Sequence, residues 1–512
     1  MPLSEVLAIT MSDPSTSIAR HYHDRTKYDP RTIASRSRAL DFDQQPSPFK
    51  TYQLGKTIDL KAYLKGQPSA ADQDWYRLSR LLYFSYGITG LVPYPNNPFY
   101  LRAAPSAGGL YPAEVYLLSR GTGLEAGLYN YQAKTHSLLQ FWDNPVWTEL
   151  QTACLQHPSL AATDLAIVIT AVFFRSSWRY EDRAYRRIFL DSGHLLGNFE
   201  LAGSLSGYRP HLIGGFLDQS LDQLLYLDTE AEGAIAVLAL EDQQASTVPL
   251  PLAPTALPST VQTDYPPLPD GQLLSFCHRA TQIDSPTPTY LTTELPQVTS
   301  EDKYNFPFCT RVSLEVNPIQ WQPQLEGLET TLLHRRSTRR YTGENLTLAE
   351  LAAVLDFSYH PEHYAEQGLD PHPDYFDLSL IETFVAVSGV TGLEEGCYYY
   401  APKAGELRQI RFKNFRRELH YLCLQQELGR DAAAVVFHTA DLQRAIESYG
   451  DRVYRYLHLD AGHLGQRLNL AAIHLNLGVS GIGGFFDDHV NEVLGIPADE
   501  AVLYITTLGR PG

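Results

Sequence analysis

The chain repeats itself, and this repeat limits what it can fold into more than any other feature. A spacing of 269 residues separates Gly123 from Gly392, Tyr180 from Tyr449 and Leu212 from Gly481. The matching segments are GLEAGLYNYQAKTHSL and GLEEGCYYYAPKAGEL, YEDRAYRRIFLDSGHLLGNFELA and YGDRVYRYLHLDAGHLGQRLNLA, and LIGGFLD and GIGGFFD. A constant register over so long a span does not arise by chance, so the chain contains two related copies of one unit.

Each copy is the size of a domain, because the spacing is far longer than the roughly 20–50 residues of solenoid repeats. We therefore predict two similar domains, at residues 15–247 and 270–512, that pack together as an internal pseudo-dimer. Residues 248–269 between them are rich in proline and poor in charge, which predicts an extended, semi-rigid linker. Weaker matches at other offsets, such as YHDRT at Tyr22 with CHRAT at Cys277, indicate insertions or deletions in loops.

Helix and strand patterns occur in both copies. Short apolar runs predict buried strands at Ala166–Phe173, Thr383–Gly389, Ala433–Thr439 and Ala501–Gly509. Apolar residues at helical spacing predict a helix over Leu348–Tyr359, with Thr347 and Glu350 at capping-box spacing, and a long helix over Tyr449–Leu477. Because helices and strands alternate irregularly, we expect an α+β fold with a central sheet in each domain.

The first candidate site is the loop PSAGG, made of Pro105, Ser106, Ala107, Gly108 and Gly109. Its side chains are so small that a flat ligand can approach the main chain and accept hydrogen bonds from its N–H groups. By itself the loop is equally consistent with an ordinary turn before the predicted strand Glu114–Leu118.

The second candidate site is an arginine cluster that occurs in the second copy only. Arg335, Arg336, Arg339 and Arg340 flank Ser337 just before a helix. Guanidinium groups and a hydroxyl are the donors that a phosphate needs, although a solvated basic face or a partner-docking patch fits the same pattern. The nearest run in the first copy, Ser35–Arg38, is weaker.

Two other motifs recur in both copies. The segment IGGF lies at Ile213–Phe216 and Ile482–Phe485, and its backbone N–H groups are candidates to bind ring carbonyls, although a turn between helix and strand explains it too. The segment DxGH lies at Asp191–His194 and Asp460–His463. No third ligand recurs with it, so we expect core histidines and no metal site. The chain lacks GxSxG and HExxH, which argues against a hydrolase.

Composition narrows the class of partner. The formal net charge is −18, which argues against nucleic acid or an anionic membrane surface as the main partner. The chain has no apolar run of about 20 residues and no N-terminal signal pattern. Its five cysteines are scattered, with no CxxC pair, so we expect a reduced, cytoplasmic protein.

Taken together, these motifs resemble the nitroreductase superfamily of flavoenzymes, and specifically its SagB/ThcOx-type peptide-dehydrogenase branch. The segments that carry the resemblance are YHDRTKYDP, RAAPSAGGLYPAEVYL, RRSTRRYT, LDAGHLGQRLNLAA and SGIGGFFDD. It implies that each domain has a mixed, mainly antiparallel sheet flanked by helices. It also implies FMN as the cofactor, bound where two subunits of the usual homodimer meet.

The resemblance assigns the cofactor-binding residues. The phosphate would be held by Arg335, Arg336, Ser337 and Arg339, with help from Arg510, and the flavin ring would lie beside Gly481, Ile482, Gly483 and Gly484. The PSAGG loop, Pro105 to Gly109, would come from the other half. Its counterpart Asp374–Phe384 has no glycine pair, and the first copy lacks the arginine cluster. We therefore expect one composite site per chain and one degenerate site.

The resemblance leaves the reaction open. Azoline-oxidising relatives carry a Lys-Tyr pair before the long helix, where this chain has Arg179 and Tyr180. These two are the candidate catalytic residues, although arginine is too basic to act as a general base. The leading prediction is an FMN-dependent oxidoreductase that dehydrogenates a peptide-derived substrate or reduces a small nitro or quinone compound with NAD(P)H. The alternative is a non-catalytic flavin-binding or scaffold partner in a peptide-maturation complex. Further homo-oligomerisation also remains open.

Overall fold

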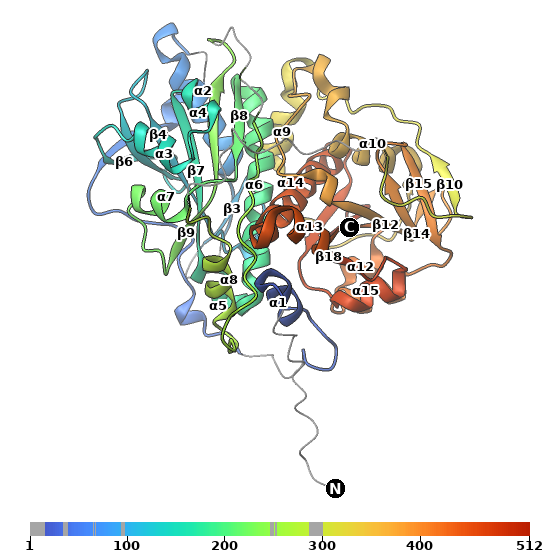
Figure 1. The fold of residues 1–512 in the computed structure, drawn as a ribbon. Coiled ribbons are helices and arrows are strands. Elements are labelled where there is room, and N and C mark those ends of the chain that lie inside the picture. The colour runs from blue at the N-terminus through green and yellow to red at the C-terminus, as the bar shows by residue number, and fades with distance from the viewer. Residues whose placement is uncertain are drawn as a thin grey trace.

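The repeat forms two sheets of the same plan (Figure 1). The structure, a computed structural model, describes residues 16–33, 39–64, 66, 68–93, 98–245, 250, 253–285 and 301–512. The first seven-stranded sheet has the order β1-β6-β5-β4-β7-β9-β8, and the second has the corresponding order β10-β15-β14-β12-β16-β18-β17. The predicted α+β fold with two similar sheet-and-helix units is confirmed. Residue 15, at the start of the first predicted domain, and the Ser35–Arg38 run lie outside the described residues.

All ladders in the two large sheets are antiparallel. Among the described residues, parallel pairing occurs only between β11 and β13 and at an isolated bridge. The strands of the first half are β1 (Lys56–Asp59), β2 (Ile88–Val92), β3 (Phe99–Arg102), β4 (Ala113–Ser119), β5 (Gly127–Gln132), β6 (Ser137–Trp142), β7 (Leu165–Val172), β8 (Tyr208–Ile213) and β9 (Glu232–Asp242). Those of the second half are β10 (Thr310–Ser313), β11 (Leu346–Thr347), β12 (Glu382–Val387), β13 (Val390–Thr391), β14 (Gly396–Ala401), β15 (Glu406–Arg411), β16 (Ala434–Asp441), β17 (Gly478–Ile482) and β18 (Glu500–Gly509).

Helices cover both faces of each sheet. They are α1 (Ile18–Arg25), α2 (Gln73–Tyr86), α3 (Trp147–Ala153), α4 (Pro158–Ala161), α5 (Phe173–Tyr180), α6 (Ala184–Ser206), α7 (Asp218–Leu224), α8 (Leu273–Ala280), α9 (Glu326–His334), α10 (Leu348–Tyr359), α11 (Arg416–Leu422), α12 (Glu427–Asp431), α13 (Leu442–Tyr449), α14 (Val453–His474) and α15 (Asp487–Leu494). Strand β4 is buried over its whole length, which explains its mainly apolar sequence. Val115 and Leu117 enter the central core, whereas Tyr116 and Leu118 enter a second core beneath α3 and α7, as the two-residue period of a strand requires. The predicted capping box of α10 is present.

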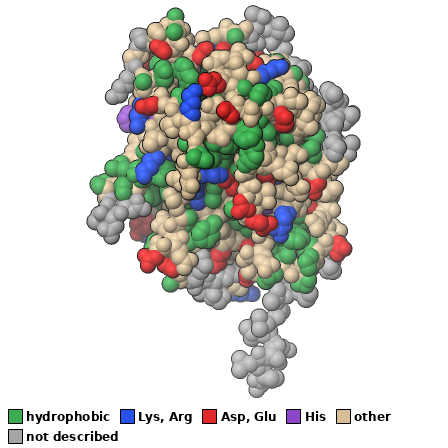
Figure 2. All heavy atoms as spheres, turned by 90° about the vertical axis from the view of Figure 1, so that its left-hand side faces the viewer, with side chains coloured by type: hydrophobic (Ala, Val, Ile, Leu, Met, Phe, Trp, Pro, Cys, Tyr) green, Lys and Arg blue, Asp and Glu red, His purple; other side chains and the backbone are tan. Residues whose placement is uncertain are grey.

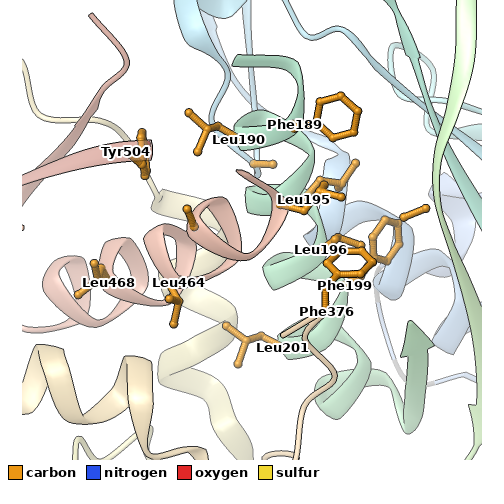
Figure 3. Packing of buried hydrophobic residues seen from close by; sticks show 14 of the residues in the cluster. Phe189, Leu190, Leu195, Leu196, Phe199, Leu201, Phe376, Leu464, Leu468 and Tyr504 are labelled. Atoms are coloured by element: carbon orange, nitrogen blue, oxygen red, sulfur yellow. The ribbon is translucent and has the colours of Figure 1, made fainter. Parts of the chain in front are cut away.

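The two long helices α6 and α14 cross at the centre of the molecule. Figure 3 shows them side by side, with leucine and phenylalanine side chains filling the space around them. A Cβ atom on Gly193 would lie 2.2 Å from the carbonyl oxygen of Leu459, and one on Gly462 would lie 2.3 Å from that of Leu190. The glycine of each DxGH motif therefore permits the backbones of the two helices to touch.

Two buried ion clusters join the halves in a pseudo-symmetric way. Asp487 of the second half accepts hydrogen bonds from Arg183 and Arg186 of the first half. At the related position, Asp218 of the first half accepts from Arg452 and Arg455 of the second. All six groups are at most 3% exposed. Each cluster thus ties a helix N-terminus in one half to the start of the central helix of the other.

Residues 253–269 of the predicted linker lie between the two halves and contact both, since Leu257 packs on Gly215 of the first half and Ser259 meets Tyr449 of the second. The Ser259 N–H donates to the carbonyl of Tyr449, and Leu257 is fully buried. The predicted long helix over Tyr449–Leu477 is present as α14, but it begins at Val453, because the chain breaks from α13 at Gly450, which has a φ of +65°. A Cβ atom there would lie 2.0 Å from the carbonyl oxygen of Ser259. The close approach of the chain before α8 therefore requires this break.

Several histidines are buried in the neutral form, which predicts sensitivity to acid. His438 is fully buried, and burial lowers its pKa to about 3. The unfolded chain takes up this proton below about pH 6.5, so the contribution of His438 to stability is complete above that pH and is lost as the pH falls toward 3. Ile169 occupies the related position of β7. We expect His438→Ile to lower the midpoint of acid unfolding by about half a pH unit, measured by circular dichroism.

The exposed His372 supplies the control for this prediction. Because this side chain lies at the surface and is not part of the buried core, His372→Gln should leave the acid midpoint unchanged. An unchanged midpoint in the His438→Ile protein would contradict the proposed cause.

Two observations bear on the class of partner. In the described part of the chain, no helix is long and apolar enough to cross a membrane. On the face of the first half shown in Figure 2, basic and acidic side chains are interspersed, and the coloured residues form no continuous basic area. The exclusion of nucleic acid therefore stays a prediction from the net charge.

Candidate functional site

Two connected cavities lie where the halves meet. The smaller, here called the slot, has a volume of about 100 Å³, and the larger, here called the cleft, has a volume of about 1540 Å³. The residues that line both are Ala107, Gly108, Arg187, Gly481 and Gly483. The slot and the cleft therefore form one continuous space, built by the PSAGG loop of the first half and the late glycine segment of the second.

The start of α6 fixes the PSAGG loop. The hydroxyl of Ser106 donates to Asp191 at 2.6 Å, and the N–H of Ala107 donates to the same carboxylate at 3.1 Å. Loss of contact with water raises the pKa of Asp191 to about 7. Gly108 adopts a φ of +65°, and a Cβ atom on it would lie 2.8 Å from the hydroxyl of Tyr180. The loop needs its glycine for both reasons.

The arginine segment contributes two residues to the slot, Ser337 and Arg339. Thr338 between them pairs with Val479 of β17, with N···O distances of 2.8 and 2.9 Å, so the segment is anchored to the second sheet. Arg339 is exposed, and among the described residues no carboxylate pairs with it. Its guanidinium group is therefore available to a ligand in the slot.

Arg335 lies behind the slot and is only 3% exposed. Its guanidinium donates to the main-chain carbonyls of Arg102 and Ala103, just before the PSAGG loop, while its Nη1 has no hydrogen-bond partner among the described residues. Burial lowers its pKa to about 10. Arg335 thus places a buried positive charge beside the loop and holds the two halves together.

Four predicted site residues line neither cavity: Arg335, described above, and Arg336, Gly109 and Arg510. Arg336 donates to the main chain and side chain of Thr89, and Arg510 forms an ion pair with Glu350 at 2.8 Å. Gly109 packs on Phe99, which leaves no room for a Cβ atom. These contacts stabilise the surrounding structure instead.

The late glycine segment forms the wall opposite the loop. Gly481, Ile482, Gly483 and Gly484 all line the cleft. A Cβ atom on Gly481 would lie 1.8 Å from the hydroxyl of Tyr504, which is held by His194 at 2.9 Å. The segment therefore presents bare backbone to the cavity.

Arg179 and Tyr180 lie in the cleft, as expected for residues that face a ligand. The sequence analysis missed Arg187, which lies one helical turn after the start of α6 and stacks 3.8 Å from the ring centroid of Tyr180. It lines both the slot and the cleft. The signal that could have revealed it is the repeat itself, because Tyr456 occupies the related position in the second half.

The pseudo-symmetric position on the other side of the interface is filled by side chains. Phe376, the counterpart of Ala107, stacks on Tyr456 with ring centroids 4.6 Å apart. The hydroxyl of Tyr456 donates to Gly214, the counterpart of Gly483, and Leu257 packs on the next glycine, Gly215. Bulky side chains thus occupy the space that corresponds to the slot in the other half of the interface.

The DxGH motifs do not gather metal ligands. His194 uses both ring nitrogens, toward Gln466 and Tyr504, and His463 contacts Glu200. Asp460 accepts from the N–H groups of Phe376 and Asp377, as Asp191 does in the first half. In the described ranges, one group has metal-ligand spacing, made of His360, Glu362 and His363. It lines neither cavity.

The slot and its opening into the cleft suit a ligand in which an anionic group is attached to a flat group. Unpaired guanidinium groups and a hydroxyl converge on the slot, and glycine-rich backbone forms the walls toward the cleft. Ligand pockets usually measure about 300–1,000 Å³, so a ligand seated in the slot extends into the cleft.

The chain matches the model of the nitroreductase family over residues 78–240 and 332–510, once in each half. It is also similar to the crystal structure of a "putative nitroreductase" from Anabaena variabilis, with 64% identity and a TM-score of 0.92. That similarity covers 97% of this chain and 100% of the other.

Two curated proteins match single regions. One is a "putative nitroreductase" of Methanocaldococcus jannaschii, 34% identical over 183 residues, which are 36% of this chain and 90% of that protein. The other is the trifolitoxin-processing protein TfxB of Rhizobium leguminosarum bv. trifolii, 29% identical over 146 residues, which are 27% of this chain and 39% of TfxB. Because the family model covers well over half of the chain and recurs in both halves, this protein belongs to the nitroreductase family and is a tandem, nitroreductase-fold oxidoreductase.

Proposed function

We propose that this protein is an FMN-dependent oxidoreductase with one composite active site per chain. The observation that carries the proposal is the pairing of intact parts across the interface: the PSAGG loop from the first half meets Ser337, Arg339 and Gly481 from the second at a single slot. The related position holds stacked aromatic side chains instead. Each half alone therefore lacks a complete site.

The phosphate of FMN fits the slot. Ser337 and Arg339 line it without carboxylate partners among the described residues, and Arg335 adds a buried charge with an unpaired Nη1 atom. In a chain with a net charge of −18, such an uncompensated cluster favours a doubly charged phosphate. Arg336 and Arg510 act indirectly, because each is engaged elsewhere.

The isoalloxazine ring fits the passage from slot to cleft. There the walls are Ala107 and Gly108 on one side and Gly481 and Gly483 on the other. A side chain on Gly481 or Gly483 would meet Tyr504 or Arg187 within 2.6 Å, so the backbone alone faces the ring. Main-chain N–H groups would then be the donors to the ring edge.

Bound FMN supplies hydride transfer through its N5 atom, and the chain supplies binding, orientation and charge. Tyr180 and Arg179 stand at the wall of the cleft where a substrate would lie against the ring. The Tyr180 hydroxyl is suited to hold a proton at a substrate oxygen. Arg179, which stays charged at neutral pH, orients a substrate but removes no proton.

The cleft has room for a second ligand, and its volume of about 1540 Å³ accommodates NAD(P)H as an electron donor or an oxidisable substrate. We favour a small-molecule substrate. The similarity to a trifolitoxin-processing protein supports a peptide-derived substrate as the second candidate.

Cofactor loading tests the proposal directly. Purified protein incubated with FMN and passed through gel filtration should be yellow and release about one FMN per chain on denaturation. Its flavin absorbance should be lost on adding NADH or NADPH without oxygen. Arg339→Ala should weaken FMN about tenfold, the effect of losing one charge-assisted hydrogen bond, and leave riboflavin, which lacks the phosphate, unaffected.

Each result has an opposite that counts against the proposal. Two flavins per chain would mean that the filled position also binds cofactor. A colourless protein that takes up no FMN would favour the scaffold alternative. Equal losses of FMN and riboflavin in Arg339→Ala would remove this residue from phosphate recognition.

A further inference from the structure

Arg187 is a buried cation without an anion. It is only 8% exposed, and its Nε atom has no hydrogen-bond partner among the described residues. No carboxylate of the described chain forms an ion pair with it. A buried guanidinium donor without an acceptor is unfavourable, and a ligand in the slot or cleft would supply the missing acceptor.

The neighbouring arginines on the same helix show the contrast. Arg183 and Arg186 both pair with Asp487, and their counterparts Arg452 and Arg455 pair with Asp218. Arg187 alone departs from the repeat, since its counterpart is Tyr456, which is hydrogen-bonded inside the filled position. Arginine therefore occurs at this position where the site is open, and it takes no part in the ion clusters that join the two halves.

The position of Arg187 points its donors into the passage between slot and cleft. Its Nη1 atom would lie 2.6 Å from a Cβ atom on Gly483, and its Nη2 atom 3.6 Å from one on Gly484. Tyr180 stacks on its guanidinium at 3.8 Å and fixes its plane. Two parallel N–H donors in a fixed plane match a planar pair of oxygens.

Three carboxylates that line the cleft already have partners within the protein. Asp270 pairs with Arg25, Glu230 with Arg279 and Asp182 with main-chain N–H groups. Asp191, on whose carboxylate the charge of Arg187 acts, also accepts hydrogen bonds from Ser106 and Ala107. The lining carboxylates named here are thus partnered, while Arg179 and Arg187 lack a carboxylate partner among the described residues.

We infer that Arg187 is a specificity-determining residue that binds a carboxylate group of the substrate against the cofactor ring. This inference rests on the proposed function, because the substrate is placed next to bound FMN. It narrows the substrate class to planar molecules that carry a carboxylate close to the reacting centre. Arg179, at the rim of the cleft, supplies a second positive charge along the entry path.

The test is binding to the FMN-loaded protein, with benzoate as the probe and benzamide as its neutral analogue of the same shape. Binding is followed by the change in flavin absorbance and by calorimetry. Arg187→Gln should weaken benzoate about 10- to 100-fold, as expected for losing a charge-assisted pair of hydrogen bonds, and change benzamide less than about threefold. Arg187→Lys keeps the charge but loses the fork, and should show an intermediate loss.

Arg279→Gln is the matched control, because it removes an exposed arginine that pairs with Glu230 at the edge of the cleft. Its benzoate affinity should equal that of the native chain. Equal benzoate affinity in Arg187→Gln, or no benzoate binding by the native chain, would overturn the inference. Loss of FMN from Arg187→Gln would also overturn it, since the cofactor would then be the anionic partner. Failure of the native chain to bind FMN would instead reject the proposed function.

Discussion

Replacing Asp218 with alanine should destabilise the protein by about 3–5 kcal/mol, the usual cost of removing one partner from a buried ion cluster. Asp218 accepts from Arg452 and Arg455 at 2.7 Å each and from the N–H of Ile283 at 2.9 Å. Without it, two guanidinium groups that are at most 1% exposed would lose their only carboxylate partner among the described residues. Urea unfolding measures the loss.

The repeat supplies a second variant and a control. Asp487→Ala removes the acceptor of Arg183 and Arg186, so we expect a loss of similar size. Asp488→Ala removes a carboxylate that is 76% exposed and pairs with Lys27, which should change stability by less than about 1 kcal/mol. If Asp218→Ala unfolds at the same urea concentration as Asp488→Ala, the two halves are not held together by these clusters.

Much of the fold could be predicted because the repeat fixes a register. The 269-residue spacing carries β4 onto β12, β5 onto β14 and β7 onto β16, and continuous apolar runs mark strands that are buried on both faces. The helix break at Gly450 was missed, since the left-handed backbone there follows from the approach of Ser259. That contact joins segments almost two hundred residues apart, and no local pattern reports it.

The sequence indicated the small residues of the candidate site more clearly than the roles of its charged residues. Glycine and alanine at Ala107, Gly108 and Gly483 stand out because large residues cannot approach a ring so closely. The sequence pattern does not distinguish Arg335 from Arg336. In the structure, Arg335 is buried behind the slot, whereas Arg336 donates hydrogen bonds to Thr89. The direction of a long side chain depends on tertiary neighbours, so a run of arginines predicts an anion site without identifying its ligands.

Comparing the two copies position by position would have shown more. Where one copy has a small or charged residue and the other an aromatic ring, one position is open and the other is filled. Ala107 against Phe376 and Arg187 against Tyr456 follow this rule. Asp191 and Asp460 are shared because both halves must fix the same loop through its N–H groups. Differences of this kind between the copies therefore indicate which position can take a ligand, and shared residues such as the two aspartates indicate what the fold requires.

Replacing Gly108 with valine should reduce bound FMN at least tenfold. Gly108 has a φ of +65°, a left-handed backbone that costs a residue with a Cβ atom about 1–2 kcal/mol. The added Cβ would also lie 2.8 Å from the Tyr180 hydroxyl and 3.4 Å from Cδ of Arg179. Because Asp191 holds the loop and the added Cβ atom would meet Tyr180, the loop must shift to make room.

Gly405→Val is the control that separates backbone strain from the site. Gly405 has a φ of +61°, and no atom lies within 4 Å of its missing Cβ atom, so valine there carries a similar backbone penalty without a clash. It lies in the turn between β14 and β15 of the second half. Flavin released per chain, measured by absorbance after gel filtration and denaturation, should match the native value for Gly405→Val and fall for Gly108→Val. Native occupancy in Gly108→Val would show that the PSAGG loop is an ordinary turn and that the cofactor lies elsewhere.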